Sequence, residues 1–187
     1  MRNADSGQLS RRSFCALGAL AAASALVPKP VMAAATAGNR ELSFFNTHTG
    51  ETLSSLYCCA ERYQPAALAK INHILRDHRA NEVKEIDLHL LDLLHKLGGT
   101  LQASKPYHVI SGYRSPSTNA LLRTQGGAHT GVASKSLHMV GKAIDIRVPD
   151  VPLKELRLAA VSLKGGGVGY YPDLNFVHVD VGRVRYW

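Results

Sequence analysis

The segment around His138 combines a histidine and a carboxylate at short range. His138 precedes Asp145 by seven residues, with Gly141 between them, and Asp145 lies in an otherwise alternating apolar stretch over residues 142–148. A glycine permits a tight turn that other residues resist. Because burying an unpaired charge is costly, a carboxylate inside such a stretch needs a partner. We expect His138 on the loop that enters a strand and Asp145 on the strand itself.

A second alternating stretch supplies another histidine. Side chains alternate between the two faces of a strand, so Phe176, His178 and Asp180 should share one face. If the two strands pair, His138, Asp145 and His178 converge. Two imidazoles and one carboxylate, with a fourth position left open for water, form a typical catalytic zinc set. The spacing of His138 and Asp145 is weak evidence alone, because most histidines are ordinary hydrogen-bonded groups.

Three motifs in this order resemble a known superfamily. Ser136 to Asp145 reads Ser-x-His-x-x-Gly-x-Ala-x-Asp, and Ser111 to Ser115 reads Ser-Gly-Tyr-Arg-Ser. The third motif joins Gly167–Tyr171 to Asn175–Asp180. Together they resemble the zinc D-Ala-D-Ala carboxypeptidase and hedgehog-like metallopeptidase superfamily, and within it the branch of exported murein endopeptidases. The resemblance covers residues 41–187.

The resemblance implies a role for each matching residue. His138, Asp145 and His178 fall on the three zinc ligands of the superfamily. Arg114 falls on its arginine, which stabilises the oxyanion of the tetrahedral intermediate. A guanidinium aimed at developing negative charge is suited to that task.

The general base is the point at which this sequence departs from its relatives. Several of them place Glu or His three or two residues before the last ligand, where this chain has Asn175 and Phe176. Asp180 is the candidate catalytic base, or alternatively a group that orients a ligand imidazole. Asp173 and His129 are weaker candidates. The sequence leaves the base unassigned.

The elements that position these residues indicate an α+β fold. Apolar residues at helical spacing predict helices over 65–77, 87–97, 118–124 and 152–163, the second ending at Gly98-Gly99. Alternation and turn residues predict strands over 41–46, 53–57, 107–110, 142–148, 168–171 and 176–181. Hairpins outnumber strand–helix–strand units, so we expect a small antiparallel sheet flanked by helices, as in hedgehog and D-Ala-D-Ala peptidases.

The first 35 residues have the features of an export signal. Paired arginines in Ser10–Phe14 precede a weakly apolar run over residues 15–27, and the small residues Ala33–Ala35 follow. This order is typical of a bacterial twin-arginine signal. We therefore expect a signal peptide over 1–35 and a zinc metallopeptidase domain over 36–187. An uncleaved short membrane anchor is the alternative.

The net charge limits the classes of molecule that the mature chain is expected to bind. The 187 residues carry a net charge of +8, but residues 1–35 hold four basic residues and one acidic residue, which leaves +5. Nucleic acid is then a poor candidate partner, and an anionic cell-wall polymer is a better one, although the charge is scattered. The mature chain needs no membrane contact.

These observations predict an enzyme, a zinc peptidase delivered to the periplasm by the twin-arginine translocase. The resemblance implies that its substrates are stem peptides of peptidoglycan, cleaved at D-Ala–diaminopimelate or diaminopimelate–diaminopimelate cross-links. A carboxypeptidase or dipeptidase acting on stem peptides is the enzymatic alternative. The alternative from another class is a zinc-bearing wall-binding module without catalysis. The bond cleaved depends on loops such as 125–135, whose shape the sequence does not give.

Overall fold

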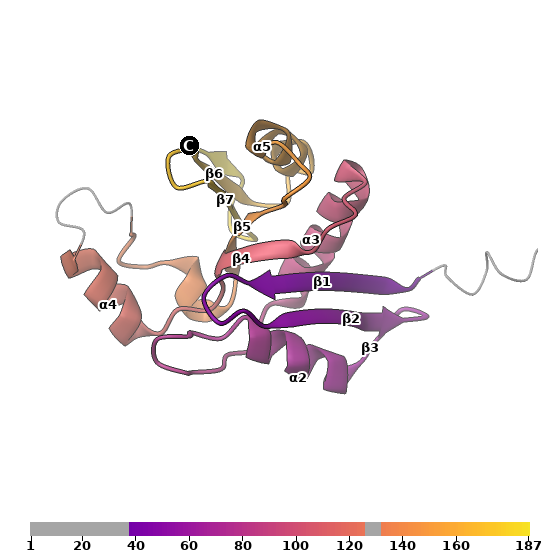
Figure 1. Cartoon of the computed structure of the whole chain (residues 1–187), viewed down its shortest axis with the longest axis horizontal. Coiled ribbons are helices and arrows are strands. Elements are labelled where there is room, and N and C mark those ends of the chain that lie inside the picture. Colours follow the sequence, from indigo (N-terminus) through magenta and orange to yellow (C-terminus); the bar gives the residue numbers. More distant parts are fainter. Residues whose placement is uncertain (1–37, 126–131) are drawn as a thin grey trace, which may run out of the picture. The chain divides into compact units, whose positions relative to one another are not determined.

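The computed structural model describes residues 38–125 and 132–187 (Figure 1). The strands are β1 (Arg40–Asn46), β2 (Thr52–Cys59), β3 (Arg62–Tyr63), β4 (Tyr107–Ser111), β5 (Ala143–Arg147), β6 (Gly167–Tyr171), β7 (Phe176–Asp180) and β8 (Arg185–Tyr186). The helices are α2 (Pro65–Ile74), α3 (Leu88–Leu101), α4 (Pro116–Gln125), α5 (Leu153–Ser162) and the 3-10 helix η2 (Leu137–Val140).

Two expectations fall on residues outside the described ranges. These are the signal peptide over 1–35 and the position of His129 in the loop after α4. Among the described residues, no helix is both long enough and apolar enough to cross a membrane.

The sheet confirms the α+β class but is larger than expected. Its eight strands run in the order β3-β2-β1-β4-β5-β7-β6-β8. Most neighbours are antiparallel, as predicted, but β1 pairs with β4 and β6 with β8 in parallel. The sheet is thus larger than the small antiparallel sheet predicted, and these two parallel pairs are its departures from the antiparallel pattern. The two-residue strands β3 and β8 carry too few residues to show any alternation.

Helices α2, α3 and α5 cover one face of this sheet. On β1, Leu42, Phe44 and Asn46 are buried and share a face. The Asn46 side chain donates to the carbonyl of Ile74 in α2 at 2.9 Å. On β2, the Tyr57 hydroxyl donates to Asp92 in α3 at 2.9 Å. Helix α5 contacts β6, β7 and α3, so the three helices lie on the same side.

Helix α3 shows how local sequence and packing combine. The Asp87 side chain caps its start by accepting from the backbone N–H of His89 at 2.9 Å. Its leucines at positions 90, 91, 94 and 97 are fully buried. The predicted stop at Gly98-Gly99 was wrong, because the helix continues to Leu101. Gly98 is instead a packing residue, since a Cβ there would lie 3.2 Å from the Tyr107 hydroxyl.

The register of β5 and β7 determines where the polar residues lie. Asp145 pairs directly with His178, and Ile144 pairs with Val179. Ile144 and Val179 are buried in the hydrophobic core. Alternation then places Asp145 and His178 on the opposite face, away from α2, α3 and α5.

The turn between η2 and β5 depends on Gly141. Its backbone has a positive φ of 67°, and a Cβ at this position would overlap the carbonyl oxygen of Glu85. The backbone at Glu85 therefore approaches position 141 too closely for any side chain there. Gly141 also accepts a hydrogen bond from the Asp87 N–H at 2.9 Å, which ties the turn to the start of α3.

Replacing Gly141 should test this close approach. We expect Gly141→Ala to lower the free energy of unfolding by about 2–4 kcal/mol, because it adds a steric clash to an unfavourable backbone conformation. Gly50→Ala is the matched control, since Gly50 has a φ of 72° but open space around it. The control should lose only about 1–2 kcal/mol. Urea unfolding measures both, and equal losses would contradict the packing argument.

Candidate metal centre

Hydrogen bonds hold both the backbone and the ring of His138. It lies in η2 and is 3% exposed, and its backbone N–H donates to the Ser136 hydroxyl that caps this turn. Its Nδ1 lies 2.8 Å from the carbonyl oxygen of Gly112. A carbonyl only accepts, so Nδ1 carries the proton. In the neutral ring, Nε2 is then left with a free lone pair.

His178 is also held through one ring nitrogen, but here the anchored nitrogen is Nε2 and not Nδ1. Its Nε2 lies 3.0 Å from Oδ2 of Asp180, which accepts the Nε2 proton. Its Nδ1 faces Oδ1 of Asp145 at 2.8 Å and Nε2 of His138 at 3.2 Å. Each histidine therefore uses one nitrogen for anchoring and turns the other toward Asp145.

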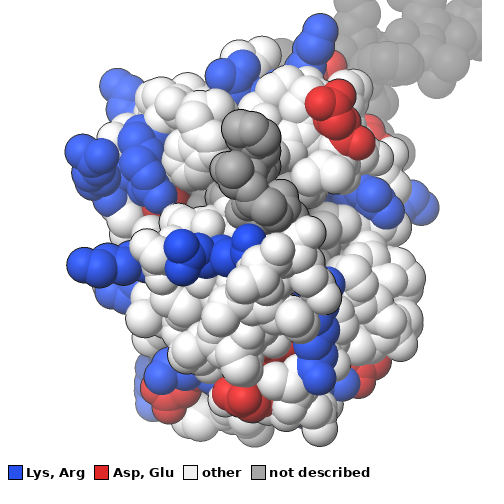
Figure 2. Space-filling model, turned by 90° about the vertical axis from the view of Figure 1, so that its left-hand side faces the viewer, with Lys and Arg blue, Asp and Glu red and all other residues white. Residues whose placement is uncertain are grey.

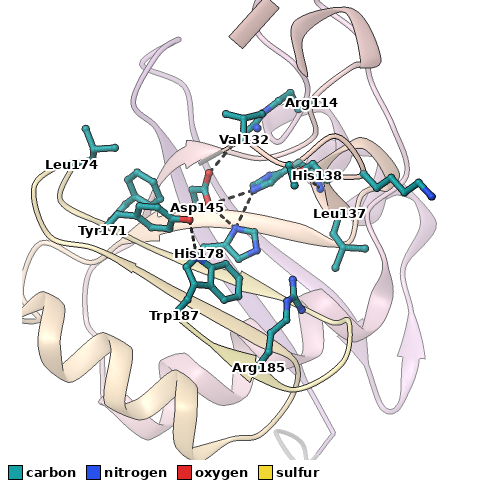
Figure 3. Close-up of a pocket in the computed structure, with 14 residues that line it drawn as sticks. Arg114, Val132, Leu137, His138, Asp145, Tyr171, Leu174, His178, Arg185 and Trp187 are labelled. Atoms are coloured by element: carbon teal, nitrogen blue, oxygen red, sulfur yellow. Dashed lines mark hydrogen bonds and ion pairs between the residues drawn. The ribbon is translucent and has the colours of Figure 1, made fainter. Parts of the chain in front are cut away.

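The three predicted ligands converge. Nε2 of His138 lies 3.3 Å from Oδ1 of Asp145, and the ligand atoms of all three residues lie within 4.8 Å of one another (Figure 3). Two tetrahedral zinc ligands with bonds of about 2.0–2.1 Å lie about 3.3 Å apart. The observed separations are close to that value. Once Nδ1 of His178 is deprotonated, two facing imidazole lone pairs beside a carboxylate fit a divalent cation.

The charge of Asp145 is stabilised by its neighbours. Burial alone would raise its pKa, but the nearby His138 and His178 hold the pKa of this carboxyl well below its usual range. Burial lowers the pKa of His178, yet its hydrogen bonds to Asp145 and Asp180 raise it to about 9. The site thus attracts positive charge at the position that Nδ1 of His178 faces, and a metal would have to displace a proton there.

Arg114 lies beside the three converging residues. Its side chain is 11% exposed, and one terminal nitrogen lies 3.6 Å from Oδ2 of Asp145. Ser111 and Asn119 accept from the guanidinium at 3.2 and 3.4 Å. Its backbone N–H donates to the carbonyl of His138 at 3.2 Å, which joins the arginine motif directly to the histidine motif.

Asp180 lies behind His178. It is 0% exposed, and its Oδ1 accepts from the backbone N–H groups of Gly167 and Gly182 at 3.0 and 2.8 Å. Its Oδ2 accepts from Arg185 at 2.6 Å as well as from His178. Burial would raise the pKa of Asp180, but these hydrogen bonds keep it well below its usual range. Its acceptor positions are occupied, and it does not line the cavity in front of His178.

A cavity of about 160 Å³ opens over the converging residues. Among the described residues that line it, Asp145 is the only carboxylate, whereas Arg114, Lys135 and Arg185 are cationic. Asp173, one of the weaker base candidates, is exposed and does not line the cavity.

Two aromatic residues of the cavity were missed from the sequence. Tyr171 and Trp187 both line it, and the Trp187 ring lies 5.4 Å from the His178 ring, centre to centre. Alternation along β6 and its pairing with β7 would have placed Tyr171 on the same face as His178. No local pattern indicates Trp187, because its position depends on the parallel pairing of β6 with β8.

Comparisons with known proteins identify the family of this chain. The family described as Peptidoglycan L,D-endopeptidase MepK matches residues 34–187. The Peptidoglycan L,D-endopeptidase MepK of Escherichia coli K12 is 44% identical over 184 residues, covering 98% of this chain and all of the relative. The Probable peptidoglycan L,D-endopeptidase MepK of Haemophilus influenzae is 42% identical over 180 residues, covering 95% of each chain. No solved structure gives a significant match.

The expected assignment to the murein endopeptidase branch is thereby confirmed, and with it the expectation of an enzyme. The family match over residues 34–187 includes every described residue. The relatives are matched over nearly their full length. This chain belongs to the peptidoglycan L,D-endopeptidase MepK family of peptidases.

Proposed function

We propose that this protein is an exported, zinc-dependent endopeptidase that hydrolyses peptide cross-links of peptidoglycan. The convergence of His138, Asp145 and His178 in one cavity beside Arg114 is the observation that carries the proposal. The relatives' names support the substrate class and the reaction.

The metal ligands in this proposal are Nε2 of His138, a carboxylate oxygen of Asp145 and Nδ1 of His178. Nitrogen and oxygen donors in a three-residue set suit zinc. A bound zinc ion would lower the pKa of water and polarise the substrate carbonyl. The Gly112 carbonyl and Asp180 hold the two rings in the tautomers that leave these nitrogens free.

Arg114 is proposed to stabilise the oxyanion. Its guanidinium is largely buried beside Asp145, where a planar donor is already oriented by Ser111 and Asn119. Donors that are oriented before the reaction stabilise developing charge without reorganising. The general base is left to a group other than Asp180, because hydrogen bonds to His178, Arg185 and two backbone N–H groups occupy that carboxylate.

The substrate bond is proposed to be an L,D peptide bond, as in the relatives' names. The diaminopimelate–diaminopimelate cross-link joins an L centre to a D centre, whereas the D-Ala–diaminopimelate cross-link joins two D centres. The cationic cavity residues suit the carboxylates of such peptides. Lys and Arg side chains are also more prominent than Asp and Glu on the face that Figure 2 shows.

Export to the periplasm by the twin-arginine route is proposed for residues 1–35. Peptidoglycan lies outside the cytoplasm, so an enzyme of this class must be exported. The paired arginines and the following apolar run support the twin-arginine translocase as the partner in export.

Hydrolysis of purified sacculi tests the proposed function. We expect the wild-type protein to convert the cross-linked muropeptides of the sacculi into monomers, to bind one zinc per chain and to lose activity after chelation. His178→Ala should lose both zinc and activity, because it removes one of three ligands. His73→Ala, at an exposed histidine outside the cavity, is the control and should behave as wild type. Elemental analysis and muropeptide chromatography measure both properties, and a full zinc complement in His178→Ala would contradict the ligand set.

Asp180→Asn separates a positioning role from a base. Because Asp180 anchors Nε2 of His178, its replacement should weaken zinc affinity by roughly 10- to 100-fold. At saturating zinc, kcat should stay near the wild-type value. Competition with a fluorescent chelator gives the affinity, and Asp173→Asn serves as the exposed control. A collapse of kcat by about 10²–10⁴-fold with unchanged affinity would instead identify Asp180 as the base.

Arg114→Lys tests the oxyanion role. Lysine keeps the charge but not the planar donor fork, so we expect kcat to fall by about 10²–10³-fold while KM and zinc content change little. Steady-state kinetics on cross-linked and linear stem peptides measure both constants. A raised KM with unchanged kcat would mean that Arg114 holds a free carboxylate of the substrate, which favours the carboxypeptidase alternative.

A further inference from the structure

One wall of the cavity is built from aromatic residues that the proposed mechanism does not use. Tyr171, at the end of β6, lies 4.6 Å from Phe176 in a stacked pair. Nε1 of Trp187 donates to the Tyr171 hydroxyl at 2.8 Å (Figure 3). The indole N–H can only donate, so the phenol oxygen is the acceptor in this bond.

Trp187 is itself held in one place. A Cβ at position 169 would lie 2.7 Å from its ring, so Gly169 leaves the space that the indole fills. The Arg185 guanidinium lies 4.9 Å from the ring centre on another side. Backbone hydrogen bonds with Val168 and Tyr170 fix its main chain to β6. The direction of its N–H, and with it the phenol oxygen of Tyr171, is therefore set by the fold.

The acceptor role of the Tyr171 oxygen leaves its own proton available. In the described part of the chain, this hydroxyl forms no hydrogen bond other than the one from Trp187. Figure 3 shows the hydroxyl directed toward the side of the cavity where Asp145 and His178 lie. A donor that faces a reaction cavity and has no acceptor among the described residues is suited to a substrate oxygen.

Arg114 and Tyr171 line the same cavity. Burial lowers the pKa of Arg114, and the nearby Asp145 carboxylate counteracts this shift. Arg114 precedes α4 and Tyr171 ends β6, so the two donors reach the cavity from different elements.

We propose that Tyr171 is a second catalytic hydrogen-bond donor, which acts with Arg114 on the carbonyl oxygen as it becomes negative, and that Trp187 is its positioning residue. The proposal rests on the proposed function, because it concerns the same cavity. In this proposal, the aromatic wall stabilises the negative charge that develops in the transition state.

Three variants and one control test the proposal. Tyr171→Phe removes the hydroxyl and keeps the ring that stacks on Phe176. Trp187→Phe removes the indole N–H and keeps an aromatic ring near His178. Tyr170→Phe is the control, because Tyr170 lies on the opposite face of β6, where its ring contacts Arg157 of α5. The double variant Tyr171→Phe/Trp187→Phe completes the set. All are assayed on cross-linked muropeptides at saturating zinc, with zinc content measured alongside.

We expect Tyr171→Phe to lower kcat by about 10- to 100-fold with KM and zinc content near wild type, since an oxyanion donor acts mainly in the transition state. Trp187→Phe should lower kcat less, and the double variant should be no slower than Tyr171→Phe, because Trp187 acts through that hydroxyl. Wild-type kcat in Tyr171→Phe, or an equal loss in Tyr170→Phe, would overturn the role of Tyr171. Fully additive losses would overturn the positioning role of Trp187.

Binding of a phosphinate analogue of an L,D dipeptide gives a second measurement that does not need turnover. Its charged oxygens imitate the tetrahedral intermediate, so Tyr171→Phe should bind it about 10- to 100-fold more weakly, and unchanged binding would overturn the proposal. Trp187 is the single tryptophan of the chain, so its fluorescence reports the hydrogen bond itself. Its emission should shift in Tyr171→Phe and not in Tyr170→Phe. Failure of the proposed function, in contrast, is decided by the wild-type protein on sacculi.

Discussion

The arrangement of this site depends on two imidazole nitrogens that face each other at 3.2 Å beside a buried carboxylate. Two lone pairs at that distance repel unless a proton or a metal ion lies between them, and a buried carboxylate is costly without positive charge nearby. The far nitrogen of each ring is anchored by a hydrogen bond, to the Gly112 carbonyl for His138 and to Asp180 for His178. The near nitrogen of each ring is therefore directed toward Asp145. A proton on Nδ1 of His178 meets these conditions without a metal, and a divalent cation would have to displace it.

Much of the surrounding structure maintains this constraint. Register between β5 and β7 places Asp145 opposite His178, and the turn at Gly141 brings His138 over the same sheet face. Asp180 can orient His178 because Arg185 and two backbone N–H groups compensate its buried charge. The core helices cover the other face, so the chemistry and the hydrophobic core occupy opposite sides of one sheet.

The sequence predicted the parts of this arrangement that local patterns encode. Alternation and the three motifs brought His138, Asp145 and His178 together, because strand pairing on a shared face was enough to join them. Alternation also placed Asp180 on the face of His178, but only the three-dimensional arrangement shows that hydrogen bonds occupy its oxygens behind the ring. Trp187 and the short strand β8 were missed because a two-residue parallel pairing has no local signal. Helix α3 continued through its glycines because tertiary packing outweighed their helix-breaking tendency.

In the proposed function, this cavity holds one zinc ion through His138, Asp145 and His178, with His178 binding through Nδ1. Anomalous diffraction at the zinc absorption edge, from crystals of the zinc-loaded protein, tests it most directly. We expect a single anomalous peak at about 2.0–2.2 Å from Nε2 of His138, a carboxylate oxygen of Asp145 and Nδ1 of His178. A peak at other residues, or a zinc ion bound to Nε2 of His178 with Asp180 displaced, would contradict it.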